Sequence, residues 1–354
     1  MNYQKTMIVL GKNTKPQLTI IIVNYNVRDF LLQCLRSIER AATHSDVEII
    51  VVDNHSSDGS SEYIKPLFPL VQWIDLPENV GFGKGNNIGI SHAQGEYTLL
   101  LNPDTILSDD TLDTMLAYMN SHPEVGISGC KVLNADGTFQ VQCRRGFPTP
   151  WVSFCKLFGL QNLFPSSPIF AQYNQTFRSE NEEYYVDALI GAFMFCRTSM
   201  LQSLHGFDED FFMYGEDLDL CFRASMEGWK TSFYPATSII HFKGESTRRS
   251  SMNEVKVFYE AMEIFARKHY GQSKIFLLLL KSGIWLRSLI AYFTKSGLTA
   301  AVVSIDILIL NAALLLATDI RFRTLFAFLH LPILLYFCGY VCICDVDAHG
   351  RGVF

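Results

Sequence analysis

The first hundred residues alternate between short apolar runs and longer amphipathic stretches. The apolar runs predict strands, the most continuous of them buried on both faces, at residues 18–23, 47–52, 71–75 and 97–101. Between the first two runs, apolar residues recur at helical spacing from Val27 to Ile38, which predicts an amphipathic helix. A helix of small residues, closed by Gly95, is expected before the fourth strand. Strand and helix alternation predicts an α/β fold with a parallel sheet covered on both faces.

The pattern changes in the second half of the chain. Prolines and aromatic residues between 140 and 185 predict an irregular region over a cleft. Residues 184–197 are expected to be extended, with Gly191 inside the strand at a point of close approach. A segment dense in carboxylates, 206–220, leads into a helix with Gly228 as its C-cap, and residues 232–242 form a further extended stretch.

Polar residues follow each predicted strand of the first half. They form four clusters, at residues 24–26, 53–54, 78–79 and 102–104. The carboxyl ends of parallel strands meet at one edge of a sheet, and ligands of α/β proteins bind there. The sequence therefore predicts a ligand site that these clusters share.

Two acidic residues in the clusters are suited to bind different parts of a ligand. Asp53 closes a buried strand and can accept hydrogen bonds from a nucleotide base or ribose, although a turn-forming role explains it equally well. Asp104 follows a buried strand and is fixed by Pro103. Its carboxylate suits Mg²⁺ or Mn²⁺ bridging a diphosphate, and the alternative is again a turn.

Two further features carry weaker signals. Residues 81–85 are glycine-rich but match neither a dinucleotide fingerprint nor a P-loop, so we interpret them as a flexible segment beside a bound sugar or diphosphate. His241 ends an extended stretch, where a lone histidine is most often structural. An imidazole there is also able to complete a metal site.

The acidic segment offers a general base. Glu216 and Asp217 are expected in the first turn of a helix, where the positive end of the helix dipole favours the ionised carboxylate. An ionised, oriented carboxylate is what proton abstraction requires. The alternative is an acidic helix cap without catalytic function.

Composition narrows the classes of partner and compartment. The formal charge of −6 over 354 residues argues against a nucleic-acid partner. Nine scattered cysteines without paired metal spacing predict free, mostly buried thiols in a reducing compartment. Mean hydropathy is +0.15, and the apolar excess is concentrated after residue 274.

This apolar tail predicts association with a membrane. Residues 275–293 fit an interfacial helix with its cations toward headgroups. Residues 298–318 and 325–344 are each long enough to span a bilayer, although Asp306 weakens the first of these predictions. The alternative is a pair of buried helices in a second soluble domain.

Five motifs in order resemble those of the inverting glycosyltransferases of family two, which have the GT-A fold. They are the opening strand at 19–26, the turn at 51–60, the segment at 78–89, Leu100–Thr105 and the acidic segment at 206–219. The resemblance covers residues 18–249. It implies a Rossmann-like GT-A domain with a mostly parallel central sheet over 16–250, followed here by a linker with the interfacial helix, 251–296, and two membrane helices, 297–354.

The resemblance also implies roles for single residues. Asp217 would be the catalytic base, and Asp104 would ligate Mg²⁺ or Mn²⁺, with His241 as a further candidate ligand. The segments that match the donor-binding motifs contain Val23, Tyr25, Asp53, Asn79, Gly81, Asn86 and Asn102. Those that match the acceptor-binding motif contain Asp208, Glu209 and Glu216.

The sequences of several motifs most resemble those of rhamnosyltransferase-type members that build cell-surface polysaccharides. This implies a dTDP- or UDP-type sugar donor and a glycan or lipid-linked acceptor. A Gln-x-x-Arg-Trp motif after the base marks processive members and is missing here, so transfer of a single sugar is expected. The catalytic domain is expected at the cytoplasmic face of the inner membrane. A nucleotidyltransferase and a non-catalytic nucleotide-sugar-binding subunit remain as alternatives.

Overall fold

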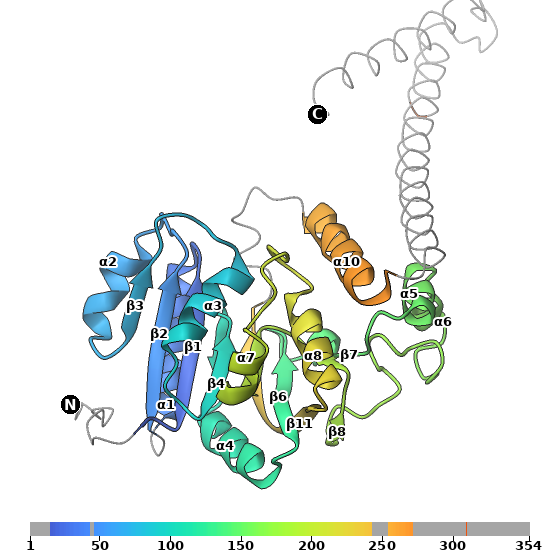
Figure 1. Ribbon diagram of the computed structural model, residues 1–354, viewed down its shortest axis with the longest axis horizontal. Helices are drawn as coiled ribbons and strands as arrows, with labels where there is room; N and C mark the ends of the chain where they lie inside the picture. Colours follow the sequence, from blue (N-terminus) through green and yellow to red (C-terminus); the bar gives the residue numbers. More distant parts are fainter. Residues whose placement is uncertain (1–14, 43–45, 243–253, 272–308, 310–354) are drawn as a thin grey trace, which may run out of the picture. The chain divides into compact units, whose positions relative to one another are not determined.

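The computed structural model of the chain describes residues 15–42, 46–242, 254–271 and 309 (Figure 1). The chain divides into two units, Met1–Ile284 and Trp285–Phe354, and a single residue of the second unit is described. The predicted membrane segments 275–293, 298–318 and 325–344 lie outside the described residues, apart from that one position, and they stay predictions. No helix within the described ranges has the length and apolar character needed to cross a membrane.

A nine-stranded mixed sheet forms the centre of the first unit. Eight of its strands follow the order β3-β2-β1-β4-β10-β6-β11-β5, and β8 pairs with β11. The strands are β1 (Leu18–Asn24), β2 (Val47–Asp53), β3 (Gln72–Asp75), β4 (Tyr97–Leu101), β5 (Thr105–Leu107), β6 (Val125–Leu133), β8 (Tyr184–Tyr185), β10 (Phe193–Arg197) and β11 (Lys230–His241). A separate two-stranded sheet joins β7 (Arg144–Arg145) to β9 (Ala188–Leu189).

The four strands predicted in the first half are confirmed, and they pair in parallel. Every residue of β1 and β4 is buried, as their continuous apolar runs indicated. β3 lies at the edge of the sheet and is only half-buried, because it has a neighbour on one side only. Its more polar sequence follows from that position.

The expectation of a mostly parallel sheet needs correction beyond β4. β10 lies antiparallel between β4 and β6, with Phe193 opposite Leu101. The chain enters β10 at the edge where β4 ends, so it must run in the opposite direction. β5 and β8 also pair antiparallel with β11. The architecture is an α/β, GT-A-like fold with a mixed sheet.

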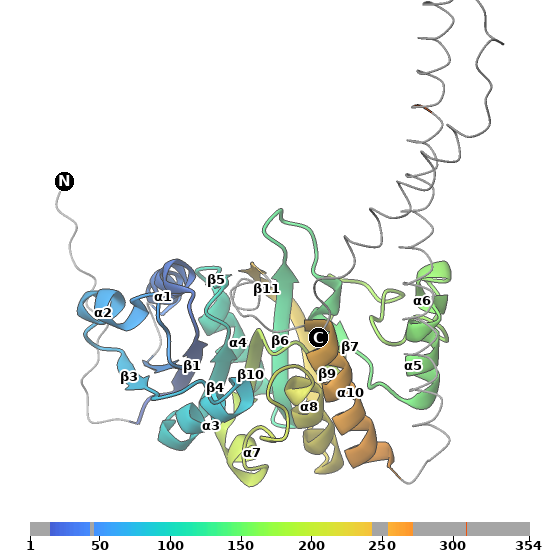
Figure 2. The same ribbon diagram turned by 90° about the horizontal axis from the view of Figure 1, so that it is seen from above.

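Helices cover both faces of the sheet (Figure 2). α1 and α4 pack on one face, and α3 and α7 pack on the other. The helices are α1 (Arg28–Ala41), α2 (Ser60–Ile64), α3 (Phe82–His92), α4 (Thr111–Ser121), α5 (Pro150–Leu157), α6 (Leu160–Leu163), α7 (Thr198–Ser203), α8 (Glu216–Met226) and α10 (Glu254–Tyr270), with short 3-10 turns η1 (Lys65–Leu67) and η2 (Val141–Cys143). The region predicted to be irregular therefore contains the two short helices α5 and α6.

The glycines of α3 allow close packing, and the prediction of a flexible segment there is wrong. Gly83 and Gly85 are helical and buried. A Cβ atom at Gly89 would lie 2.4 Å from Cγ2 of Ile21 in β1, which leaves no room for a side chain. Small residues are thus required because helix and strand approach each other closely.

The ends of α8 show how local sequence fixes the acidic segment. Tyr214 and Gly215 both have positive φ, which turns the chain into the helix at Glu216. At the other end Gly228 has φ +88°, and Trp229 N–H donates to the carbonyl of Ala224. This is the Schellman arrangement, so the predicted glycine cap is confirmed.

Candidate functional site

A cavity of ≈ 370 Å³ opens at the carboxyl ends of β1, β2 and β4, beside the first turn of α8. This is the edge of the sheet where the polar clusters were expected to converge. Nine of the residues predicted for the site line the cavity, namely Val23, Tyr25, Asn79, Gly81, Asn102, Asp104, Glu216, Asp217 and His241. They come from positions that span most of the first unit.

Two predicted donor-binding residues are not among the described residues that line the cavity. Asp53 accepts hydrogen bonds from the Asn24 side chain at 2.8 Å and from Ser56 N–H at 2.9 Å. These bonds hold the turn after β2, and the predicted nucleotide contact of Asp53 stays a prediction. Asn86 is buried in α3, and its amide donates to the carbonyl of Phe82.

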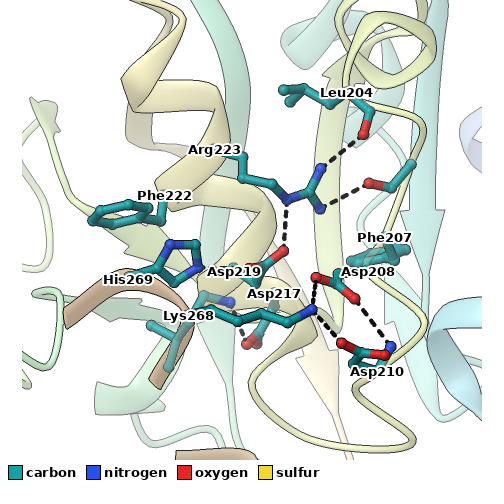
Figure 3. A network of polar contacts seen from close by, with 12 residues as sticks. Leu204, Phe207, Asp208, Asp210, Asp217, Asp219, Phe222, Arg223, Lys268 and His269 are labelled. Carbon is teal, nitrogen blue, oxygen red and sulfur yellow. Dashed lines mark hydrogen bonds and ion pairs between the residues drawn. The ribbon is translucent and has the colours of Figure 1, made fainter. Parts of the chain in front are cut away.

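Two predicted acceptor-binding residues also lie elsewhere. Asp208 forms an ion pair with Lys268 of α10, and Lys268 is 2.5 Å from Asp210 as well (Figure 3). Although partial burial opposes it, the hydrogen bond from Lys268 lowers the pKa of Asp208. Glu209 accepts a hydrogen bond from Asn87. These carboxylates fasten the acidic segment to α10 and α3.

Asp104 and His241 meet because β5 pairs with β11. The register places His241 opposite Thr105, next to Asp104. Both side chains are about 95% buried or more, and His241 Nε2 is 3.4 Å from Asp104 Oδ1. Oδ1 of Asp104 and Oδ1 of Asn102 are buried without a hydrogen-bond partner in the part of the chain that the structure describes.

The other ring nitrogen of His241 contacts Gln140. Nδ1 lies 2.9 Å from Oε1 of Gln140, which is itself buried. This contact holds the imidazole ring with its Nε2 toward the carboxylate of Asp104.

These observations test whether a divalent cation fits. No group of three or more His, Cys, Asp or Glu residues suited to a metal occurs among the described residues. Mg²⁺, however, is usually held by one or two carboxylates together with phosphate oxygens and water. The carboxylate of Asp104 and the amide oxygen of Asn102 at the cavity are oxygen donors of that kind, and His241 adds an imidazole beside them.

Asp217 projects into the cavity from the first turn of α8. Its Oδ2 lies 2.5 Å from Nη2 of Arg145 and accepts a hydrogen bond from Gly191 N–H at 2.9 Å. Its Oδ1 accepts from Leu218 N–H at 2.7 Å. These donors fix the orientation of the carboxylate in the cavity.

Glu216 lines the same cavity in a different environment. It is 6% exposed, and its Oε2 has no hydrogen-bond partner among the described residues. Burial, together with the neighbouring charge of Asp217, raises the pKa of Glu216 to about 8. Burial therefore favours the protonated form of Glu216 near neutral pH.

A third carboxylate of α8 has a structural role. Asp219 is fully buried, and it contacts Arg223 at 2.6 Å and His269 of α10 at 2.7 Å (Figure 3). The guanidinium of Arg223 also donates to the carbonyl of Leu204. This network holds α10 against α8 and against the loop that precedes the site.

Sequence reasoning missed several residues that line or shape the cavity. Arg145 lies on β7, which pairs with β9 and so reaches Asp217 across 72 positions of sequence. Lys156 and Tyr173 come from the region over the cleft and line the cavity. No local motif marks the contacts of these three residues. Asn54, which belongs to the predicted cluster at 53–54, donates to Asn79 and accepts from Val80 N–H, which orders the loop before α3.

The fold, with its cavity at the strand ends, places the chain in the α/β, GT-A-like class. Residues 19–185 match the family profile described as glycosyl transferase family 2. The chain is 27% identical to the N-acetylglucosaminyl-diphospho-decaprenol L-rhamnosyltransferase of Mycobacterium tuberculosis (strain H37Rv) over 267 residues, which cover 72% of this chain and 85% of that relative. It is 29% identical to the rhamnosyltransferase WbbL of Escherichia coli (strain K12) over 238 residues, 65% of this chain and 84% of the relative.

Solved structures of glycosyltransferases are also similar to this chain. The mannosyltransferase PcManGT from Pyrobaculum calidifontis, in complex with GDP-Man and Mn²⁺, has 16% identity and a TM-score of 0.46, covering 82% of this chain and 81% of that one. S. aureus TarS 1–349, in complex with UDP-GlcNAc, has 19% identity and a TM-score of 0.46. That match covers 71% of this chain and 65%, just under two thirds, of TarS 1–349.

The match of residues 19–185 to the glycosyl transferase family 2 profile, together with the rhamnosyltransferase relatives, identifies the protein as a glycosyltransferase. The predicted enzyme class is confirmed, which sets aside the nucleotidyltransferase. The six cysteines within the described ranges are free and buried, as expected from their spacing.

Proposed function

We propose that the protein transfers a single sugar from a nucleotide-diphosphate donor to a hydroxyl group of a lipid-linked glycan acceptor, with inversion at the anomeric carbon. The observation that carries this proposal is the shared cavity. It contains the candidate cation ligands Asn102, Asp104 and His241 and also the oriented carboxylate of Asp217. A donor diphosphate needs the cation ligands, and an acceptor hydroxyl needs the carboxylate of Asp217.

The donor side is proposed to use the strand ends. Val23, Tyr25, Asn79 and Gly81 line the cavity around the ends of β1 and β2 and are suited to contact the nucleotide. Asp104 and His241 would hold Mg²⁺ or Mn²⁺, with the Asn102 amide oxygen beside them. When bound, the cation would neutralise charge on the leaving diphosphate.

The acceptor side is proposed to use Asp217. Its carboxylate, oriented by Arg145 and Gly191 N–H, would accept the proton of the attacking hydroxyl. Because one displacement occurs, the configuration of the anomeric carbon would invert.

The relatives support a choice of substrate class. Both relatives described above are rhamnosyltransferases, and one acts on N-acetylglucosaminyl-diphospho-decaprenol. We therefore infer a rhamnosyl donor of the dTDP or UDP type and a sugar–diphospho-polyprenol acceptor. A catalytic domain at the cytoplasmic face of the membrane would meet both, since nucleotide sugars are cytosolic.

The test combines binding with transfer. The full chain would be screened by thermal shift against dTDP-, UDP- and GDP-sugars with Mn²⁺ or Mg²⁺, and the stabilising donor would be assayed with a diphospho-polyprenol-linked GlcNAc acceptor. We expect a product of inverted anomeric configuration by NMR. EDTA should abolish its formation, and added Mn²⁺ or Mg²⁺ should restore it. Full transfer after dialysis against EDTA would contradict the metal-dependent mechanism, and a product of retained configuration would contradict the base role of Asp217.

A further inference from the structure

The segment over the cleft exposes an unusual number of large apolar side chains. Of thirteen exposed large hydrophobic residues within the described ranges, six fall between 151 and 169. We call them the aromatic patch, which consists of Trp151, Phe154, Phe158, Leu163, Phe164 and Ile169. They belong to α5, α6 and the loops next to these helices, at the end of the first unit away from α2 (Figures 1 and 2). A concentration of this kind marks an interaction surface.

The patch is organised by its own contacts. The ring of Trp151 stacks on Phe154 with centroids 5.8 Å apart, and Phe154 lies 4.6 Å from Phe158. The indole N–H of Trp151 donates to the carbonyl of Ile169 at 3.0 Å, which joins the two ends of the segment. The polar atom of the indole is thereby satisfied, and nearly half of the residue's surface remains exposed.

The charge around the patch favours one class of partner. The chain carries a formal charge of −6, but residues 137–179 contain no Asp or Glu. Their basic residues include Arg178, which is exposed, and Lys156, which is half-buried. Aromatic side chains flanked by cations, without acidic residues, are typical of surfaces that enter the headgroup region of an anionic membrane.

The same segment reaches the candidate site. Lys156 of α5 and Tyr173 both line the cavity together with Asp217, and the Lys156 ammonium lies 3.2 Å from the centroid of the Tyr173 ring. α5 and α6 have eight and four residues, whereas a helix needs about 20 residues to span a bilayer. These helices are therefore long enough to contact lipid at the bilayer surface but not to cross the bilayer.

We propose that the aromatic patch docks on the surface of a lipid bilayer and presents the cavity to an acceptor carried by that bilayer. The indole and phenyl rings would enter the interfacial layer, while the exposed Arg178 faces anionic headgroups. Docking through the patch is separate from any contact made by the apolar tail. Only the statement about the acceptor rests on the proposed function.

The first test measures where Trp151 lies in the bilayer. In the full chain, Trp73, Trp229 and Trp285 are replaced by Phe, so that Trp151 is the single tryptophan. The protein is mixed with phosphatidylglycerol–phosphatidylcholine vesicles that contain acyl-brominated lipid. We expect strong quenching of the Trp151 emission. The matched control carries Trp151→Phe and Tyr63→Trp, which places the probe at an exposed position of α2 at the other end of the unit, and it should show little quenching.

Three outcomes of this test overturn the proposal. Unquenched emission at a solvent wavelength means that the patch stays in water. Unquenched, blue-shifted emission means that protein covers it, either another segment of this chain or a second copy, and cross-linking distinguishes these two. Equal quenching at positions 151 and 63 means that the bilayer contact is not specific to the patch.

A second test keeps the native tryptophans in case the triple replacement does not fold. Leu163→Ser and Phe164→Ser are compared with Leu67→Ser and Leu70→Ser, which are similarly exposed near α2. Leu163→Ser and Phe164→Ser each remove an apolar side chain that the bilayer would bury. Each should raise KM for a polyprenol-linked acceptor about tenfold or more, while transfer to a short soluble acceptor is unchanged. Equal effects of both pairs overturn the docking proposal. A wild-type chain that uses neither acceptor refutes the proposed function, and the quenching result still decides the docking.

Discussion

Replacing Asp217 by Asn tests the proposed catalytic base most directly. The amide keeps the shape of the carboxylate but does not accept a proton, so transfer should fall by about 10²–10⁴-fold, which is the usual contribution of general base catalysis. Donor nucleotide binding should change little, because the candidate donor and cation ligands are on other elements. The assay is single-turnover transfer with saturating donor, together with a donor titration.

The structure also predicts a cost in stability. The side chains of Arg145 and Asp217 are only 12% and 10% exposed, and they form an ion pair. Breaking a buried pair by neutralising one partner costs about 3–5 kcal/mol, and we expect the lower end because the amide oxygen still accepts a hydrogen bond. For a domain of this size, about 3 kcal/mol corresponds to a fall in Tm of roughly 6–12 °C. Transfer must therefore be measured well below that transition.

A matched control separates lost stability from lost chemistry. Asp219→Asn neutralises another buried carboxylate of α8, which bonds Arg223 and His269 and is absent from the described cavity lining. It should lower Tm by a comparable amount and leave transfer per folded molecule nearly unchanged. If Asp219→Asn reduces transfer as much as Asp217→Asn does, the loss reflects distortion of α8.

The result that would refute a base role for Asp217 would make Glu216 the next candidate base. Near wild-type transfer by Asp217→Asn would remove Asp217 from the mechanism. The pKa of Glu216 is raised by burial, so a base at this position would be protonated and inactive below about pH 8 and active above it. A rate that rises with pH through this range in wild type, and loses that dependence in Glu216→Gln, would assign the base to Glu216.

Three further predictions follow from particular contacts. Gln140→Ala removes the side chain that contacts His241 Nδ1 and holds the ring beside Asp104, so it should weaken activation by Mn²⁺ about 10–100-fold with normal metal-free nucleotide binding. Asp104→Ala should be more severe, and equal metal dependence in wild type and Gln140→Ala would contradict the proposed cation site. Gly89→Ala should destabilise the protein by about 1–3 kcal/mol in urea unfolding, because the added Cβ would lie 2.4 Å from Ile21 Cγ2, and this outweighs the better helix propensity of Ala. Ser91→Ala, on the exposed side of α3, should not destabilise it. A chain cut after Gly271 should be soluble and bind donor nucleotide. A chain cut after Asn253 should be less stable, because it loses the contacts of Lys268 with Asp208 and of His269 with Asp219. Release of the full chain from membranes by carbonate would show that the tail does not span the bilayer.

The sequence by itself determined the elements of the fold and the edge at which the site forms. Burial on both faces requires continuous apolar runs, so β1, β2 and β4 were identifiable from Leu18, Val47 and Tyr97 onward. Parallel strands bring their carboxyl ends together, so Asn79, Asn102 and Asp104 could be assigned to one cavity in advance. These inferences depend on local periodicity and on chain direction, which residues encode over short distances.

Only the tertiary structure decided which distant residues meet. The pairing of β5 with β11 brings His241 to Asp104, and the pairing of β7 with β9 brings Arg145 to Asp217. It also showed that Asp208 is bound to Lys268 and does not line the cavity. The physical reason is that strand order and register arise from the packing of the whole sheet, while a single segment specifies only its own period and the face that it buries.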